Sequence, residues 1–240
     1  MRLLPRRPAP PPPRHVGLIL DGNRRWARRR GLRRVTDGHH VGFARTPEVL
    51  TWCEHAGVHH VTLWMLSTEN LNRDAAEITE VMDVLCATVR RLAFQDRWTI
   101  RHLGTTDGLS AGVRAMLELA ERETATGERT MTVDLAIGYG GRREITDAVR
   151  TVLTHAVRDH GLSPRQAVAD LTPEQITEHI TADHPPPDLI IRTSGELRSS
   201  GFLLWSGTDA HWWTTPTLWP DFRRRDLHHA LTHYRKAQRR

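Results

Sequence analysis

Two kinds of hydrophobic pattern alternate along the chain from residue 15 onward. Short, nearly continuous apolar runs such as VGLIL (16–20) and DLIIR (188–192) are typical of parallel strands that are buried on both faces. Between them lie amphipathic stretches with apolar residues at helical spacing. The apolar runs predict strands at 15–20, 60–66, 99–104, 130–138, 188–193 and 202–205.

The amphipathic stretches predict five helices, near 46–56, 77–94, 110–125, 142–159 and 173–182. The last of them has a clear start signal, because Thr172 is a good N-cap, Pro173 suits the first helical position and Gln175 follows three residues after the cap. Alternating strands and helices, without an internal repeat or a second domain boundary, predict the α/β class. We expect a single domain at 15–240 with a central, mainly parallel six-stranded sheet flanked by helices.

The net charge of +6 on the 240 residues is unevenly distributed. Residues 1–34 contribute +10 and residues 223–240 contribute +6, so the body between them is acidic, at −10. A nucleic-acid-binding protein would have its basic surface on the folded body, so we expect no nucleic-acid partner. Residues 1–14 hold six prolines and four arginines and are predicted to form a disordered arm.

Hydropathy and cysteine content narrow the class of protein further. No apolar stretch approaches the roughly 18 residues needed to span a bilayer, and the arm lacks the continuous apolar segment of a signal peptide. Cys53 and Cys86 are the two cysteines, which argues against a disulfide framework and for a reducing compartment. A cytoplasmic protein is therefore expected.

Polar loops follow four of the predicted strands, and three of these loops contain glycine. They are DGNRRW (21–26), STENLNR (67–73), YGGR (139–142) and RTSGELRSS (192–200). Ligands of parallel α/β sheets bind at the carboxyl ends of the strands, so these loops are the first candidates for a site.

The residue types in these loops favour diphosphate groups. Glycine lets the backbone approach an anion, helix N-termini present free N–H groups, and arginine matches phosphate oxygens with two parallel hydrogen bonds. Asp21 is the one acid among residues 1–34, and Mg²⁺ is usually held by one or two carboxylates together with substrate phosphates. P-loop and GxGxxG patterns are absent. The sequence therefore predicts a site for one or two diphosphates, at least one of them bound with Mg²⁺.

The first two loops also have ordinary structural explanations. The arginines at 24–34 could form a solvated helix face, and residues 21–23 could form a turn. Residues 67–70 could form a helix N-cap, where the charge of Glu69 interacts favourably with the helix dipole. Trp212 and Trp213 are more typical of a core or an interface than of a binding platform. The occurrence of four such loops at strand ends favours a site.

Six segments also match a known family, in the same order along the chain. They are HVGLILDGNRRWARRRGL (15–32), GHHVGF (38–43), STENLNR (67–73), YGGRREI (139–145), PDLIIRTSGELR (187–198) and LWPDF (218–222). Together they resemble the cis-prenyltransferases, typified by undecaprenyl diphosphate synthase, over about residues 15–235. The resemblance implies a parallel sheet flanked by helices, a homodimer, and Mg²⁺-dependent condensation of isopentenyl diphosphate with an allylic prenyl diphosphate to form a cis double bond.

The resemblance also implies roles for individual residues. Asp21 would bind Mg²⁺ and assist departure of the allylic diphosphate, and Asn70 with Ser67 would lie where isopentenyl diphosphate loses its proton. Residues implied to bind the allylic diphosphate are Gly22, Asn23, Arg24, Arg25, Trp26, Arg34, His39 and Arg73. Thr68 and Glu69 are implied to be further substrate-binding residues, and Arg192, Arg198 and Ser200 would bind isopentenyl diphosphate.

The sequence departs from the family pattern at several positions. His211 stands where the family has a glutamate that helps complete the Mg²⁺ site, often across the dimer, and imidazole is a poor ligand for so hard an ion. We therefore expect His211→Glu to increase Mg²⁺-dependent turnover. Asp134, Gly138 and Gly201 replace asparagines, and Leu66 stands where an aromatic is common. Residues 77–104 form a segment about one helical turn shorter than in long-chain members, which predicts a short- to medium-chain product.

Two alternative functions stay open, and so does contact with a membrane. A divergent member could couple two allylic diphosphates irregularly, or cyclise or ionise one of them; His211 favours divergence, whereas Arg192 and Arg198 favour a second diphosphate. The chain could also be a non-catalytic subunit of a heteromeric prenyltransferase, although such a subunit would not need Asp21 and Asn70. Finally, the basic ends would favour peripheral contact with an anionic membrane surface.

Overall fold

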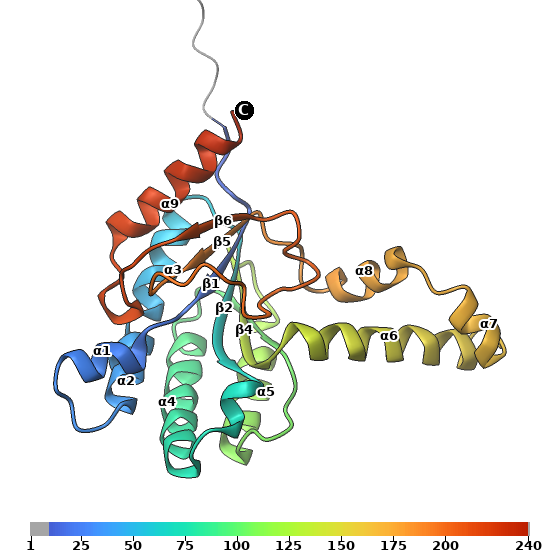
Figure 1. Ribbon diagram of the computed structural model, residues 1–240, viewed down its shortest axis with the longest axis horizontal. Coiled ribbons are helices and arrows are strands. Elements are labelled where there is room, and N and C mark those ends of the chain that lie inside the picture. Colours follow the sequence, from blue (N-terminus) through green and yellow to red (C-terminus); the bar gives the residue numbers. More distant parts are fainter. Residues whose placement is uncertain (1–9, 240) are drawn as a thin grey trace, which may run out of the picture.

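A central sheet of six strands runs through the structure, a computed structural model that describes residues 10–239 (Figure 1). Its strands are β1 (His15–Ile19), β2 (His60–Ser67), β3 (Thr99–Leu103), β4 (Thr132–Tyr139), β5 (Leu189–Arg192) and β6 (His211–Thr214). They lie in the order β3-β4-β2-β1-β5-β6, and every neighbouring pair is parallel. The predicted parallel sheet is confirmed, and the carboxyl ends of all its strands lie at one edge.

The five predicted helices are present close to their expected bounds. They are α3 (Thr46–His55), α4 (Ala75–Ala93), α5 (Ala111–Thr124), α6 (Gly141–Arg158) and α8 (Pro173–Thr181). The predicted capping box at Thr172 forms, since its hydroxyl accepts from the Gln175 backbone N–H and the Gln175 side chain accepts from the Thr172 backbone N–H. The described chain ends in α9 (Arg224–Ala237).

Four α-helices were not predicted: α1 (Asn23–Arg29), α2 (Thr36–Ala44), α7 (Pro164–Ala169) and α9. Helix α1 is short and arginine-rich, so it shows no apolar stripe. Helix α2 contains glycines, which lower helix propensity. At Gly42 the glycine is required by packing, because a Cβ there would lie 2.2 Å from Oδ1 of Asn23 in α1. Packing of α1 against α2, rather than local sequence pattern, therefore accounts for these two helices. Both lie beside the site described below.

One face of the sheet is buried beneath α2, α3, α4, α5 and α9, which share the main hydrophobic core with it. Leu18, Leu63 and Leu135 lie in register on neighbouring strands, are all 1 % exposed or less, and belong to this core. Along β1, Val16 and Leu18 belong to this core and Ile19 to the cluster on the opposite face, which is the period-two pattern expected of a strand.

Residues 202–205, predicted as a strand, do not form one. The backbone there turns, with Ser200 at φ 52° and Leu203 at φ 43°. Phe202 and Leu203 instead pack on the second face of the sheet against Ile190. The prediction was wrong because a short apolar run can be buried as a loop packed over a sheet as well as in a strand of the sheet.

The sixth strand is β6, a four-residue edge strand that sequence analysis missed. It contains both Trp212 and Trp213, and all of its residues are half-buried. Trp213 packs against the main core and Trp212 against the opposite cluster, as alternation along a strand requires. The interpretation of these tryptophans as structural residues agrees with this placement.

The elements after β4 extend away from the sheet. In Figure 1 helix α6 projects sideways, α7 lies at its far end, and α8 returns beside it toward the sheet. A small separate cluster of Ala148, Ile176 and Ile180 joins α6 to α8. Within residues 10–239 no helix has the length and apolar character that crossing a bilayer requires.

Residues 1–9 of the predicted arm lie outside the described residues. At its end, Arg14 is tied to the sheet, because its backbone N–H donates to Oδ2 of Asp188 (2.7 Å) and its carbonyl accepts from the N–H groups of His59 and His60 (2.9 Å each).

Candidate active site

A cavity of about 820 Å³ opens at the carboxyl edge of the sheet. Seven arginines and two carboxylates line it among the described residues: Arg24, Arg25, Arg28, Arg73, Arg142, Arg192, Arg198, Asp21 and Glu69. The wall also has apolar side chains, Ile19, Leu20, Trp64, Met65, Leu66 and Leu204. A cavity with this lining suits a molecule that joins anionic groups to a hydrocarbon chain.

Asp21 lies at the centre of the polar wall, directly after β1. Its Oδ2 accepts from Nη2 of Arg192 (2.8 Å), and its Oδ1 has a longer contact with Nη2 of Arg25 (3.5 Å). Burial alone would raise the pKa of Asp21, but hydrogen bonds from Arg192 and Ser194 and the charges of both arginines outweigh burial and lower this pKa below its usual value. The carboxylate is therefore ionised at neutral pH.

The turn at Gly22 brings Asp21 to the cavity. Gly22 is the N-cap of α1 with φ 107°, in the left-handed region. A Cβ at this position would lie 2.8 Å from Cδ2 of Leu218. Backbone conformation and close packing both favour glycine here.

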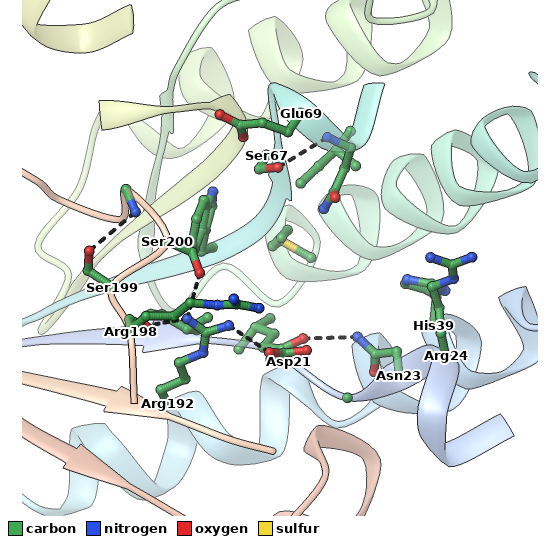
Figure 2. A pocket seen from close by; sticks show the side chains of 18 of the residues that line it. Asp21, Asn23, Arg24, His39, Ser67, Glu69, Arg192, Arg198, Ser199 and Ser200 are labelled. Atoms are coloured by element: carbon green, nitrogen blue, oxygen red, sulfur yellow. Dashed lines mark hydrogen bonds and ion pairs between the residues drawn. The ribbon is translucent and has the colours of Figure 1, made fainter. Parts of the chain in front are cut away.

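Arg192 ends β5 and organises the loop that follows it. Its guanidinium is 5 % exposed, donates from Nη1 to Oγ of Ser200 (2.8 Å) and to the carbonyl of Arg198, and donates from Nη2 to Asp21. Figure 2 shows Arg192, Arg198 and Ser200 gathered on one side of Asp21. The predicted grouping of these three residues is thus present in the structure.

A second basic group lies on the other side of Asp21, where Figure 2 shows Arg24 beside His39. Glu77 of α4 holds two arginines there, at 3.2 Å from Nε of Arg24 and 3.3 Å from Nη1 of Arg73. Arg73 also donates from Nη2 to Oδ1 of Asn70 (2.7 Å). The cavity therefore contains two groups of arginines, with Asp21 between them.

Ser67 and Asn70 lie where β2 ends. The backbone N–H of Asn70 donates to Oγ of Ser67 (3.1 Å), which joins the end of β2 to the short 3₁₀ turn Glu69–Asn72. The N-cap residue of this turn is Thr68 rather than Ser67. The same loop presents Ser67, Glu69 and Asn70 to the cavity.

His39 of α2 lines the cavity as a neutral base. Burial, together with the nearby charge of Arg73, lowers the pKa of His39 to about 4. Its Nδ1 is buried without a hydrogen-bond partner in the described structure. A neutral imidazole beside arginines can donate one hydrogen bond to an anion.

Four predicted site residues do not line the cavity in this structure: Trp26, Arg34, Thr68 and His211. Trp26 is buried beneath Arg30, whose guanidinium lies 4.5 Å from the ring centre. Arg34 is exposed and pairs with Asp37 (3.2 Å) and Glu80 (3.7 Å).

Thr68 and His211 lie elsewhere for different reasons. Thr68 packs under Gly140, where a Cβ would meet its hydroxyl at 2.5 Å. His211 begins β6 beside Leu189, at the amino end of β5, and packs against Tyr234 of α9. Asp21 follows the carboxyl end of β1, so one chain does not bring His211 to Asp21.

The structure adds cavity residues that were not predicted, among them Arg28, Trp64, Gly141, Arg142 and Ser199. Arg142 belongs to the YGGR loop, so the position of that loop after a strand was a usable signal. Arg28 stood in an arginine run without distinguishing features. Glu77, which pairs with two site arginines, lay in a predicted helix and gave no signal.

The donor set around Asp21 fits a magnesium ion. Asp21 offers an ionised carboxylate, and the contact of its Oδ1 with Arg25 is long, at 3.5 Å. Mg²⁺ is commonly held by one or two carboxylates, substrate phosphate oxygens and water. Asp21 is therefore the residue that would hold the ion together with a bound diphosphate.

Comparison with known proteins agrees with this geometry. A family model described as "Putative undecaprenyl diphosphate synthase" matches residues 19–240. An isoprenyl transferase of Thermus thermophilus is 44% identical over 236 residues, covering 96% of this chain and 89% of that protein. A (2Z,6E)-farnesyl diphosphate synthase of Mycolicibacterium smegmatis is 40% identical, covering 95% and 87%. The crystal structure of lavandulyl diphosphate synthase from Lavandula x intermedia, in complex with dimethylallyl diphosphate, superposes with a TM-score of 0.84 at 31% identity, covering 93% and 95%.

Proposed function

Because the chain belongs to the prenyltransferase family of undecaprenyl diphosphate synthase, we propose that it condenses isopentenyl diphosphate with an allylic prenyl diphosphate. The product would be a short-chain prenyl diphosphate with a new cis (Z) double bond. The observation that carries this proposal is the pair of arginine groups on either side of Asp21 in one cavity with apolar side chains in its wall. A short product agrees with the name of the Mycolicibacterium relative.

The allylic diphosphate would bind beside α1 and α2. Arg24, Arg25 and Arg73 supply positive charge there, neutral His39 donates a hydrogen bond, and the N-terminus of α1 presents backbone N–H groups. These groups would stabilise the negative charge that grows on the diphosphate as the carbon–oxygen bond breaks. The apolar wall around Trp64 and Leu66 would shelter the electron-poor allylic carbon from water.

Isopentenyl diphosphate would bind beside the β5 loop. Arg192 and Arg198 would hold its diphosphate, with Ser200 fixing the Arg192 guanidinium. Its double bond would then attack the allylic carbon, a carbon–carbon bond would form, and loss of a proton would complete the product. Ser67 and Asn70 lie in the cavity wall after β2, where they could orient this substrate for proton loss.

Magnesium dependence is part of the proposal. Mg²⁺ bound by Asp21 and diphosphate oxygens would supply Lewis-acid stabilisation of the departing diphosphate. The observation behind this assignment is the ionised Asp21 carboxylate facing a cavity rich in arginine.

A homodimer also remains a prediction. Helix α6 has 18 residues, of which Gly141 and Ala148 are buried in the described structure, and it projects from the body in Figure 1. An amphipathic helix with so little of its length covered would gain stability from a second copy. Light scattering after size-exclusion chromatography measures the assembly, and a monomeric mass at micromolar concentration would contradict it.

A cytoplasmic location stays a prediction from the cysteine content.

The decisive experiment is mass spectrometry of products from dimethylallyl, geranyl and farnesyl diphosphate, each with and without isopentenyl diphosphate. We expect elongated products that need both isopentenyl diphosphate and Mg²⁺. Arg192→Lys should weaken isopentenyl diphosphate binding, because lysine cannot bridge Asp21 and Ser200, whereas Arg114→Lys on the exposed side of α5 serves as a matched control. Elongated product without isopentenyl diphosphate, or no product from any mixture, would overturn the proposal.

A second candidate is coupling of allylic diphosphates to one another. Two observations favour it: His211 stands where the family pattern has glutamate, and the superposing lavandulyl diphosphate synthase holds dimethylallyl diphosphate. This candidate predicts product from dimethylallyl diphosphate alone in the same assay.

A further inference from the structure

A second group of charged and polar side chains lies at the amino edge of the sheet, at the opposite end of the strands from the cavity. His60 is the first residue of β2, and Asp134 is the third residue of the neighbouring strand β4. His184 comes from the connection between α8 and β5. Asp134 is fully buried and His60 is buried, whereas the His184 side chain keeps 20% exposure and borders solvent.

The two imidazoles converge on one carboxylate. Nε2 of His60 lies 2.5 Å from Oδ2 of Asp134, and Nδ1 of His184 lies 2.9 Å from the same oxygen. The contact of His184 lacks hydrogen-bond geometry, so its Nδ1 has no hydrogen-bond partner in the described structure. The other carboxylate oxygen, Oδ1, is likewise buried without a partner there. Two buried polar atoms without partners, beside an anion, are unusual enough to require an explanation.

The surrounding residues do not supply the missing partner. Thr62 lies 3.3 Å from Oδ2 of Asp134. Nδ1 of His15 must donate to the carbonyl of Pro185 (2.6 Å), so Nε2 of a neutral His15 ring accepts the Thr62 hydroxyl proton (2.8 Å). The Thr62 hydroxyl then donates to His15 rather than to Oδ2 of Asp134. Oδ1 of Asp134 has no donor among the described residues.

We propose that His60, Asp134 and His184 bind a transition-metal ion of the Zn²⁺ type. Two imidazoles and one carboxylate form a ligand set that suits Zn²⁺, whereas Mg²⁺ prefers oxygen ligands. The three ligand atoms lie within 4.8 Å of one another. Tetrahedral coordination at 2.0–2.1 Å spaces ligand atoms by about 3.3 Å, so each contact to Asp134 would lengthen by less than about 1 Å.

The ion would have a structural role that is separate from the reaction. It would join β2, β4 and the connection before β5, three segments that are distant in sequence. Oδ1 of Asp134 or a water molecule entering past His184 would complete the coordination. Asp21, at the other edge of the sheet, offers oxygen alone and would keep its preference for Mg²⁺.

Cobalt titration tests the site directly, because Co²⁺ replaces Zn²⁺ and gives intense visible absorption in tetrahedral sites with nitrogen ligands. Chelator-treated full-length protein is titrated with CoCl₂ and then with ZnCl₂. Bound metal is counted by mass spectrometry, and the melting temperature is recorded with and without ZnCl₂. We expect one tightly bound Co²⁺ per chain, its displacement by Zn²⁺, and a higher melting temperature with Zn²⁺.

Matched variants locate the signal. Asp134→Asn keeps the shape of the side chain and removes its charge, and His184→Ala removes the ligand nearest to solvent; each should abolish the absorption. The control is the double variant His155→Ala, His160→Ala, which removes an exposed histidine pair beside Asp159 on α6 and the turn after it. Asp21→Asn is a second control for the catalytic carboxylate, and both controls should keep the absorption.

Three results would overturn the proposal. Wild-type protein without tetrahedral Co²⁺ absorption and without a Zn²⁺-dependent melting shift would show that protons alone bridge the cluster. Loss of the signal in the His155, His160 control would show surface binding. Loss in Asp21→Asn would place the ion in the catalytic cavity. Because the wild-type measurement decides by itself, failure of a variant to fold does not protect the proposal, and its outcome is independent of the proposed prenyl transfer.

Discussion

Each edge of the sheet has an aspartate among basic residues, but the two aspartates differ in burial and in the residues that contact them. At the carboxyl edge, Asp21 faces an open cavity in which seven arginines outnumber two carboxylates. At the amino edge, Asp134 is fully buried, with two histidines converging on one of its oxygens. Both carboxylates have a lowered pKa, although burial opposes ionisation in each, because neighbouring hydrogen bonds and charges outweigh burial.

The two edges differ in how far their charges are compensated. Excess positive charge at the carboxyl edge is available to bind anionic substrates, and that edge is built from loops and short helices. At the amino edge, one carboxylate contacts two histidines, and these groups lie near the beginnings of the strands. We therefore expect changes at the first edge to alter catalysis and changes at the second to alter stability.

The largest expected effect is that of Asp21→Asn. Loss of the carboxylate removes the residue assigned to Mg²⁺ and should lower kcat/KM by at least about 10²-fold. Steady-state kinetics with isopentenyl and geranyl diphosphate measure this value. The matched control is Asp147→Asn, a half-buried residue that pairs with Arg143 on α6 and should leave kcat/KM unchanged. A decrease below tenfold for Asp21→Asn would contradict the assigned role.

Asp134→Ala should instead act on stability. Removing the carboxylate leaves His60 and His184 without their acceptor in a buried place, which should lower the free energy of unfolding by about 3 kcal/mol. Urea denaturation of metal-free protein at pH 7.5 measures the loss, and the folded variant should keep its kcat/KM. Asp159→Ala, which removes an exposed partner of His155, should change stability by less than about 0.5 kcal/mol. Equal losses of unfolding free energy in the two variants would show that the buried contacts of Asp134 add no more stability than an exposed ion pair.

The neutral His39 makes the carboxyl edge sensitive to acid. Its pKa is lowered to about 4 in the folded state from 6.5, so the unfolded chain binds the proton more readily, and stability falls as pH decreases below about 6.5. Between pH 7 and pH 5 this group should cost about 2 kcal/mol of unfolding free energy. Urea denaturation at both pH values should show the cost in wild type, and His39→Gln should lack that part of it. An NMR titration that places the His39 pKa near 6.5 would contradict the prediction.

The smallest expected effect is that of Ser200→Ala. The hydroxyl accepts one hydrogen bond from Arg192, which remains held by Asp21 and the Arg198 carbonyl. We expect KM for isopentenyl diphosphate to rise about fivefold, or about 1 kcal/mol, with KM for the allylic substrate unchanged. Ser199→Ala, at the neighbouring position, should change either KM by less than twofold. A rise in the allylic KM alone would show that the assignment of the two substrates is reversed.

Patterns with a single physical cause were predicted well. Continuous apolar runs located β1 to β5 because a strand buried on both faces needs apolar residues on both. Amphipathic spacing located α3, α4, α5, α6 and α8 but missed the 14-residue α9. The loops after β1, β2, β4 and β5 were found because parallel strands bring their carboxyl ends to one edge. The prediction of a strand at 202–205 was wrong because an apolar run shows burial but does not distinguish a strand from a segment packed over a sheet.

By itself, the sequence determined the class of fold, the edge of the sheet that carries the site and the family to which the chain belongs. These conclusions depend on local patterns and motifs, and on the geometry common to all parallel sheets. The tertiary structure alone decided that Glu77 pairs with Arg24 and Arg73, and that His211 lies at the opposite end of β6 from the site. It also decided that His60, Asp134 and His184 meet. Such contacts join residues that are distant along the chain. They stabilise the protein only after packing has brought the side chains together and removed them from water.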